Sequence, residues 1–218
     1  MEYFITGIDT DIGKTFVTKG LALTLEQLGN KVGVFKPLQS SAIETGNELL
    51  APDLEAIKEL SNTINTKCSY IFKGDVSPAL ASRLAGIKID INKIKTDFNT
   101  FKKENNITLV EGAGGILAPA TDTMLCADLI KELNIPIIIV SVPFLGRLNH
   151  TLLTIHYAKT NNIPIKGIII NKVPTQTNNL ATQNFIDELK RYTDVEILGT
   201  IKEINNKDIF EEFKKIKL

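Results

Sequence analysis

Residues 7–15 read GIDTDIGKT, and this stretch decides the fold. The segment Tyr3–Thr6 before it is typical of a strand, and the apolar stripe that follows predicts a helix from Thr15 to Leu28. A glycine turn between a strand and a helix presents backbone N–H groups to an anion. The stretch therefore predicts a phosphate-binding loop, in which Lys14 reaches nucleotide phosphates and the Thr15 hydroxyl holds Mg²⁺.

Two details of this loop depart from other phosphate loops. Five residues, rather than four, separate Gly7 from Gly13. ATPases of the chromosome-partitioning and septum-positioning type carry a second lysine near the start of the loop, where this chain has Asp9. Asp9 therefore argues against a nucleotide-gated switch of that type.

Short apolar runs alternate with helical patterns along the rest of the chain. Strands apolar on both faces that alternate with helices indicate a parallel sheet covered on both sides. We expect an α/β fold of the P-loop NTPase type, with a doubly wound, mostly parallel sheet and helices on both faces, in a single domain spanning residues 1–218. Further strands are predicted at Val32–Phe35, Thr108–Val110, Ile137–Val142, Ile165–Ile170 and Val195–Leu198, and further helices at Asp53–Leu60, Pro78–Ala85, Ile91–Lys103, Asn149–Thr160 and Asn178–Arg191. A loop is expected from Gln39 to Asn47, and the tail from Lys207 to Leu218 is expected to be an amphipathic helix.

The composition excludes several classes of protein. The chain has 218 residues with 25 basic and 25 acidic side chains, which argues against binding to nucleic acid or to an acidic membrane surface. No apolar run approaches the length of a membrane span, and the N-terminus lacks the pattern of a signal peptide. The two cysteines, Cys68 and Cys126, are expected to be free thiols in a cytoplasmic protein.

Polar residues that end strands are the next candidates, because ligands bind beyond the carboxyl ends of parallel strands. Lys36 ends the second strand, where it would face the same crevice as Lys14. Glu111 ends the strand Thr108–Val110 and runs into glycines that let the backbone approach a phosphate, so its carboxylate would be aimed at Mg²⁺. Asp53 begins a helix and is either a cap or a metal ligand, and Asn171 is either a loop cap or an adenine contact.

The two histidines, His150 and His156, lie on one predicted helix. No Asp or Cys is spaced to complete a catalytic triad or a metal site with them. His150 at the helix start is therefore expected to be structural or to shape a substrate site, and Thr10 either shapes the loop or contacts substrate.

Taken together, these motifs resemble dethiobiotin synthetase, an ATP-dependent family of biotin biosynthesis. The similarity covers nearly the whole chain. Its pieces are the stretch FITGIDTDIGKT (4–15), Phe35-Lys36-Pro37, Ser40, Asp53, Ser77-Pro78, VEGAGG (110–115), Leu145-Gly146, Asn149-His150 and Asn171.

The resemblance implies a ligase reaction. Members convert 7,8-diaminononanoate, CO₂ and MgATP into dethiobiotin, ADP and phosphate. A substrate amine captures CO₂ as a carbamate, the carbamate attacks the γ-phosphate, and the second amine closes a ureido ring on the resulting anhydride. The family acts as a homodimer, with the substrate site near the subunit interface.

The resemblance also assigns roles, residue by residue. Lys36 and Lys14 match catalytic lysines, and Thr15, Asp53 and Glu111 match the Mg²⁺ ligands. Substrate contacts fall on Thr10, Ser40, Gly146 and Asn149. The ATP contacts fall on Asp11, Ile12, Gly13, Lys14, Thr15, Phe16, Asp53, Glu111, Gly112, Ala113, Gly114, Asn171 and Lys172.

Two positions depart from the family pattern at the adenine pocket. The chain reads Gly199-Thr200-Ile201-Lys202 where many members have a proline in place of Lys202, and Lys172 stands where an Asp is frequent. The alternatives from other classes are a partitioning-type ATPase switch and an amide-forming cobyrinate-type synthetase. Asp9 argues against the first, and a length that leaves no room for a glutaminase domain argues against the second.

Overall fold

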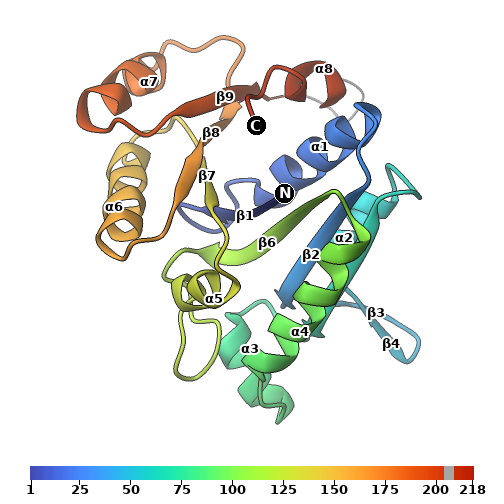
Figure 1. Ribbon diagram of the computed structural model, residues 1–218. Helices are drawn as coiled ribbons and strands as arrows, with labels where there is room; N and C mark the ends of the chain where they lie inside the picture. The colour runs from blue at the N-terminus through green and yellow to red at the C-terminus, as the bar shows by residue number, and fades with distance from the viewer. Residues whose placement is uncertain (204–208) are drawn as a thin grey trace.

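The computed structural model describes residues 1–203 and 209–218. These residues form a seven-stranded sheet in the order β5-β2-β6-β1-β7-β8-β9, in which every neighbouring pair is parallel (Figure 1). The strands are β1 (Glu2–Gly7), β2 (Val32–Gln39), β5 (Asn65–Ile71), β6 (Ile107–Gly115), β7 (Ile137–Ser141), β8 (Ile165–Val173) and β9 (Ile197–Lys202). The predicted fold class is therefore confirmed.

Helices cover both faces of the sheet (Figure 1). On one side α1 packs against α2 and α8, and on the other α4 packs against α5 and α6 packs against α7. The helices are α1 (Lys14–Gln27), α2 (Pro52–Lys58), α3 (Pro78–Ala85), α4 (Ile91–Phe101), α5 (Cys126–Leu133), α6 (Arg147–Thr160), α7 (Leu180–Tyr192) and α8 (Ile209–Phe213), with a 3₁₀ turn at Lys102–Glu104.

The centre of the sheet excludes water because its strands are apolar on both faces. All five residues of β7 are buried, and β1 on one side and β8 on the other present buried isoleucines to it. Aromatic packing then fixes α4 on β2, where Phe35 lies 5.8 Å from Phe98 and 6.0 Å from Phe101 between ring centroids. This rigid layer holds the carboxyl ends of β1, β2 and β6 side by side.

Several strands run further than the sequence pattern predicts. Lys36, Glu111 and Asn171 were expected to end their strands, but β2 continues to Gln39, β6 to Gly115 and β8 to Val173. Pairing with neighbouring parallel strands keeps these polar segments extended, which a search for apolar runs does not detect. The expected strand Val195–Leu198 instead spans Ile197–Lys202.

Other elements were missed altogether. The edge strand β5 and the helix α5 were not predicted, and the expected loop Gln39–Asn47 contains one arm of a small hairpin, β3 (Ile43–Thr45) with β4 (Glu48–Leu50). Strand β5 is half-buried along its whole length, so it lacks the apolar run typical of the inner strands. Helix α6 begins at Arg147 rather than Asn149.

The C-terminal tail is partly as expected. Residues Lys207 and Asp208 lie outside the described residues, and helix α8 follows them. Phe213 of α8 is buried against Gly20 of α1, where a Cβ would lie 2.3 Å from the ring, and its ring centroid is 5.8 Å from that of Phe16. Gly20 thus creates the space that seats the tail on α1. No helix among the described residues has the length and apolarity needed to cross a lipid bilayer.

Candidate active site

The phosphate loop is held in shape from strand β8. Gly13 adopts φ = 87°, and a Cβ built there would lie 2.2 Å from Nδ2 of Asn171, so only glycine fits. Asn171 donates from Nδ2 to the carbonyl of Ile12 at 2.9 Å, and Lys172 donates from Nζ to the carbonyl of Asp11 at 2.8 Å. The loop therefore depends on residues of β8 that lie 159 and 161 positions later in the chain.

Lys14 is folded back over this loop. Its Nζ donates to the carbonyl of Asp9 at 2.9 Å, and the residue is only 8% exposed. Burial lowers the pKa of Lys14, and the nearby positive charge of Lys36 lowers it further. A buried ammonium that donates to a neutral carbonyl, with no carboxylate partner among the described residues, is suited to receive an anion.

A bulge in the pairing of β1 and β6 sets the shape of the opposite wall. Ile5 pairs with Glu111, but the next pair is Gly7 with Gly115, so β6 has two extra residues in this interval. Gly112 and Gly114 accommodate the bulge: a Cβ on Gly112 would lie 2.7 Å from the ring of Phe4, and Gly114 has φ = 66°. The backbone of β6 therefore curves alongside the start of the phosphate loop.

Four side chains meet between these walls. Lys36 Nζ lies 2.5 Å from Asp53 Oδ2 and 2.8 Å from Glu111 Oε1, and it also donates to the carbonyl of Gly112 at 3.2 Å. Thr15 Oγ1 lies 2.8 Å from Asp53 Oδ1 and 2.9 Å from Glu111 Oε1. These residues are up to 96 positions apart in the sequence, and the sheet brings them together.

The charges of this cluster depend on one another. Burial disfavours the ammonium of Lys36, but Glu111 and Asp53 outweigh burial and raise the pKa of Lys36 above its ordinary value. Burial raises the pKa of Glu111, against the opposing effect of Lys36. Burial also disfavours ionised Asp53, but Lys36 and Thr15 outweigh it, so the pKa of Asp53 is lowered.

The oxygens of this cluster fit a magnesium ion. Thr15, Asp53 and Glu111 are hard oxygen donors, and Oε2 of the buried Glu111 has no hydrogen-bond partner, which leaves an acceptor for a metal-bound water. Within residues 1–203 and 209–218, no three His, Cys, Asp or Glu side chains are grouped to hold a metal. Magnesium is usually held by one or two carboxylates together with substrate phosphates, so this donor set matches a nucleotide-bound metal.

The cluster opens into a crevice of about 450 Å³. Among the residues expected at the site, those that line it are Thr10, Asp11, Gly13, Lys14, Thr15, Lys36, Ser40, Asp53, Glu111, Gly112, Ala113, Gly114 and Lys172. Ile12 packs its side chain beneath Gly7, and the ring of Phe16 turns toward Phe213, so only their backbones can face a nucleotide.

Gly146 and Asn149 do not line this crevice. Gly146 precedes helix α6 with φ = 84°, and Asn149 lies in the first turn of that helix. Both residues therefore lie apart from Lys36 and Ser40 within this chain.

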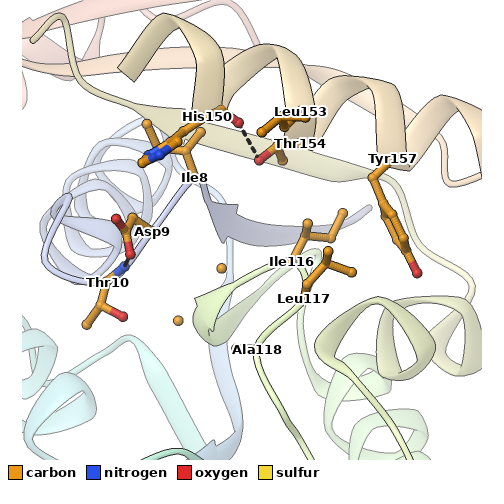
Figure 2. A pocket seen from close by; sticks show the side chains of 12 residues that line it. Ile8, Asp9, Thr10, Ile116, Leu117, Ala118, His150, Leu153, Thr154 and Tyr157 are labelled. Atoms are coloured by element: carbon orange, nitrogen blue, oxygen red, sulfur yellow. Dashed lines mark hydrogen bonds between the residues drawn. The ribbon is translucent and has the colours of Figure 1, made fainter. Parts of the chain in front are cut away.

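A second hollow of about 420 Å³ adjoins the crevice, and Thr10 and Gly114 line both (Figure 2). Figure 2 shows Ile116 and Leu117 on one side of the hollow and Leu153 and Tyr157 of helix α6 on the other. The hollow thus extends the site with apolar side chains, and Asp9, His150 and Thr154 also line it.

Sequence reasoning missed one contact at the edge of this hollow. Arg147 donates to Asp9 Oδ2 at 2.6 Å and lies 3.0 Å from Nδ1 of His150, while the amide of Thr10 donates to Asp9 Oδ1 at 2.8 Å. The Arg147 hydrogen bond, together with the Thr10 amide, lowers the pKa of Asp9. No spacing rule could find a pair 138 residues apart. Gln39, Ser41 and Asp75 also line the crevice and were not predicted.

Comparisons with known proteins agree with this geometry. A family model described as an AAA domain matches residues 1–208. Among solved structures, a plasmid partition protein from Borrelia burgdorferi superposes with a TM-score of 0.64 at 19% identity, over 98% of this chain and 95% of that one. A ParA family ATPase from Chlorobium tepidum superposes with a TM-score of 0.61 at 13% identity, over 99% of this chain and 90% of that one. At such low identity these structures show the fold alone.

Sequence relatives are more specific. The ATP-dependent dethiobiotin synthetase of Clostridium novyi is 35% identical over 98% of this chain and 92% of its own length. The enzyme of Anoxybacillus flavithermus is 36% identical over 94% of this chain and 92% of its own length. The enzyme of Bacillus cereus (strain B4264) is 39% identical over 78% of this chain and 70% of its own length. The phosphate loop carries Asp9 in place of a lysine, and two buried lysines share one crevice with two carboxylates. The sequence identity extends over nearly the whole chain. On this evidence, the chain belongs to the ATP-dependent dethiobiotin synthetase family.

Proposed function

We propose that this protein is a dethiobiotin synthetase, which carboxylates 7,8-diaminononanoate with CO₂ and closes the ureido ring at the expense of ATP. The observation that carries the proposal is the pair of buried lysines, Lys14 and Lys36, facing Asp53 and Glu111 in one crevice beside the phosphate loop. A partitioning-type switch carries its second lysine near the start of the phosphate loop, where this chain has Asp9, whereas Lys36 lies on β2. A ligase that joins two anions needs a second cation beside the phosphates, and Lys36 would supply it.

ATP would lie along the phosphate loop. Backbone N–H groups from Asp11 to Phe16 and the N-terminus of α1 would hold its phosphates, with Lys14 turned from the Asp9 carbonyl to the β- and γ-phosphates. Gly112, Ala113 and Gly114 would approach from the other wall. Asn171 does not line the crevice, but its buried Oδ1 has no hydrogen-bond partner among the described residues and would be an acceptor for the amino group of adenine, while Lys172, the next residue, lines the crevice.

Thr15, Asp53 and Glu111 would hold Mg²⁺, which when bound neutralises charge on the phosphates. The remaining chemistry falls to the lysines. A carbamate and a γ-phosphate are both anions, so bringing them into contact is electrostatically costly. Lys36 and Lys14 would offset that repulsion, orient the carbamate oxygen toward phosphorus and stabilise charge as ADP leaves. Attack of the second amine on the carbonyl carbon then expels phosphate.

The diamine would enter beside Thr10 and Ser40, which line the crevice near Lys36. Gly146 and Asn149 lie outside the crevice of their own chain, so their proposed substrate contacts are made across a homodimer. Exposed apolar side chains support this assembly: Phe144, Leu145 and Leu153, near the start and middle of α6, and Leu117, across the hollow from that helix, are 40–83% exposed. We place the enzyme in the cytoplasm, with small molecules rather than nucleic acid or membranes as its partners.

The test is an assay of phosphate release with mass-spectrometric detection of dethiobiotin. We expect release from ATP only when Mg²⁺, 7,8-diaminononanoate and bicarbonate are all present, with one phosphate for each dethiobiotin. Release at an equal rate without the diamine would reject the ligase and favour the partitioning-type ATPase switch.

A further inference from the structure

The deepest point of the crevice contains a cation that belongs to the protein itself. Lys36 Nζ is surrounded by three oxygens, from Asp53 at 2.5 Å, Glu111 at 2.8 Å and Gly112 at 3.2 Å. The side chains of Lys36 and Glu111 are 4% and 1% exposed, so water contributes little to this arrangement. The ammonium is therefore coordinated much as a metal ion is, by converging oxygens in a buried site.

The same oxygens form the proposed magnesium site. Both carboxylates that contact Lys36 also lie within 2.9 Å of the Thr15 hydroxyl. That hydroxyl has a single proton and can donate to only one carboxylate at a time. Without Lys36, the buried carboxylate of Glu111 and the partly exposed carboxylate of Asp53 would thus face each other with one hydroxyl proton between them, an arrangement that mutual repulsion disfavours.

We propose that Lys36 is the built-in counter-ion of the metal site, occupying it in the unloaded protein and giving it up when a divalent cation arrives with the nucleotide. The inference rests on the magnesium site of the proposed function, but not on the ligase reaction. It explains how the two carboxylates stay aligned before loading. It also implies that the divalent cation enters together with the nucleotide. A free cation must displace a tethered ammonium without help, whereas a cation bound to nucleotide brings phosphate oxygens with it.

Displacement would have a second effect. The freed ammonium remains attached to β2, in the crevice that Ser40 also lines, and anions are the partners suited to it. The same event that seats the metal thereby turns Lys36 toward the place where two anionic reactants meet. Lys36 would thus serve the empty site and the loaded site in succession.

The experiment compares thermal unfolding in EDTA and in Mg²⁺, and Mn²⁺ binding by calorimetry, all without nucleotide. In the unchanged protein we expect the same melting temperature in both buffers and weak Mn²⁺ binding. In Lys36→Met we expect a lower melting temperature in EDTA, recovery in Mg²⁺, and Mn²⁺ binding at least about tenfold tighter, because two carboxylates are left without their cation.

Two controls isolate the effect. Lys93→Met removes a lysine that pairs with Asp97 and does not line the crevice, so it should give no metal response. Lys36→Met combined with Glu111→Gln removes one of the two facing carboxylates and should abolish the gain in Mn²⁺ affinity. If Lys36→Met is unfolded in EDTA, refolding on addition of Mg²⁺ supports the proposal.

The proposal would be overturned if Lys36→Met showed the same melting temperature in EDTA and in Mg²⁺ and bound Mn²⁺ no more tightly than the unchanged protein. That result would mean that metal and ammonium occupy separate places, with water between the metal and the carboxylates. The ligase assay does not enter this test, so the inference can fail while the proposed function stands.

Discussion

At the residue scale, Gly13 and Asn171 form a contact on which the phosphate loop depends. The amide of Asn171 occupies the space where a side chain at position 13 would begin, and it donates to the neighbouring carbonyl of Ile12. Glycine at 13 thus meets two demands at once, a left-handed backbone and a close neighbour. The chain offers a natural comparison in Gly29, which has the same φ of 87° but nothing within 4 Å of its Cβ position.

Gly13→Ala should therefore cost more stability than Gly29→Ala. A left-handed backbone alone should cost each variant about 1–2 kcal/mol of unfolding free energy. Gly13→Ala adds the clash with Asn171 and should also weaken nucleotide binding at least about tenfold, because the loop must shift. Urea unfolding and titration with ATP analogues measure both quantities. Equal losses for the two variants, with unchanged nucleotide affinity, would show that the Asn171 contact does not shape the loop.

At the element scale, helix α4 is fastened to the edge strand β5 through one carboxylate. Asp97 accepts hydrogen bonds from Ser69 at 2.8 Å and Lys93 at 2.6 Å, and lies 3.0 Å from Nζ of Lys67. Partial burial disfavours its ionised form, but these donors outweigh burial and lower the pKa of Asp97 to about 2. An edge strand that lacks a neighbour on one side gains a covering helix in this way.

Asp97→Asn should lower stability by an amount that depends on pH. Because the pKa of Asp97 is lower in the folded protein than its ordinary 3.8, its contribution is fully present above pH 4 and lost as the pH falls toward 2. We expect a difference of about 1–2 kcal/mol in unfolding free energy at pH 7, closing over that range. Chemical denaturation at several pH values measures it. As a control, Asp122→Asn removes an exposed pair with Arg83 and should change stability much less. A gap that persists unchanged at pH 2 would rule out the ion pairs as its source.

The elements also show what the sequence could and could not predict. The inner strands and helix α1 were predictable because their apolar spacing reflects burial on both faces of a sheet or along one stripe of a helix. Strand β5 was not, because it is half-buried and mixes Lys67, Ser69 and Tyr70 with few apolar residues. The site residues on the phosphate loop and on β6 follow from local motifs. The Arg147–Asp9 pair and the convergence of Lys36 on two carboxylates arise from sheet order, and no local pattern encodes them.

At the scale of the whole molecule, exposed leucines lie at the start of helix α6 and beside the hollow that this helix lines. Leu145 is 83% exposed just before helix α6, and Leu153 is 57% exposed on that helix, beside the hollow of Figure 2. Exposed apolar side chains are suited to an interaction site. In the homodimer that we propose, their position beside Gly146 and Asn149 would bring these two residues to the substrate of the partner.

Leu153→Asp should shift the proposed homodimer toward monomer. Burying a carboxylate without a partner at an interface is costly, so we expect the dimer dissociation constant to rise at least about tenfold. Light scattering after gel filtration, over a range of protein concentrations, measures this. Leu180→Asp is the matched control, since Leu180 is 74% exposed on α7 and should leave the assembly state unchanged. If both variants keep the mass of the unchanged protein, the dimer does not use this face.

The tether from β8 to the phosphate loop has a consequence for the order of events during synthesis. The bond from Asn171 to Ile12 spans 159 positions, and the bond from Lys172 to Asp11 spans 161. Contacts so distant in sequence form late, after the intervening strands have docked. A nascent chain therefore exposes the GIDTDIGKT segment early but cannot fix its conformation until β8 has left the ribosome. Nucleotide would then stabilise only the last stage of folding, and a chain interrupted before residue 171 would carry the motif without the binding site.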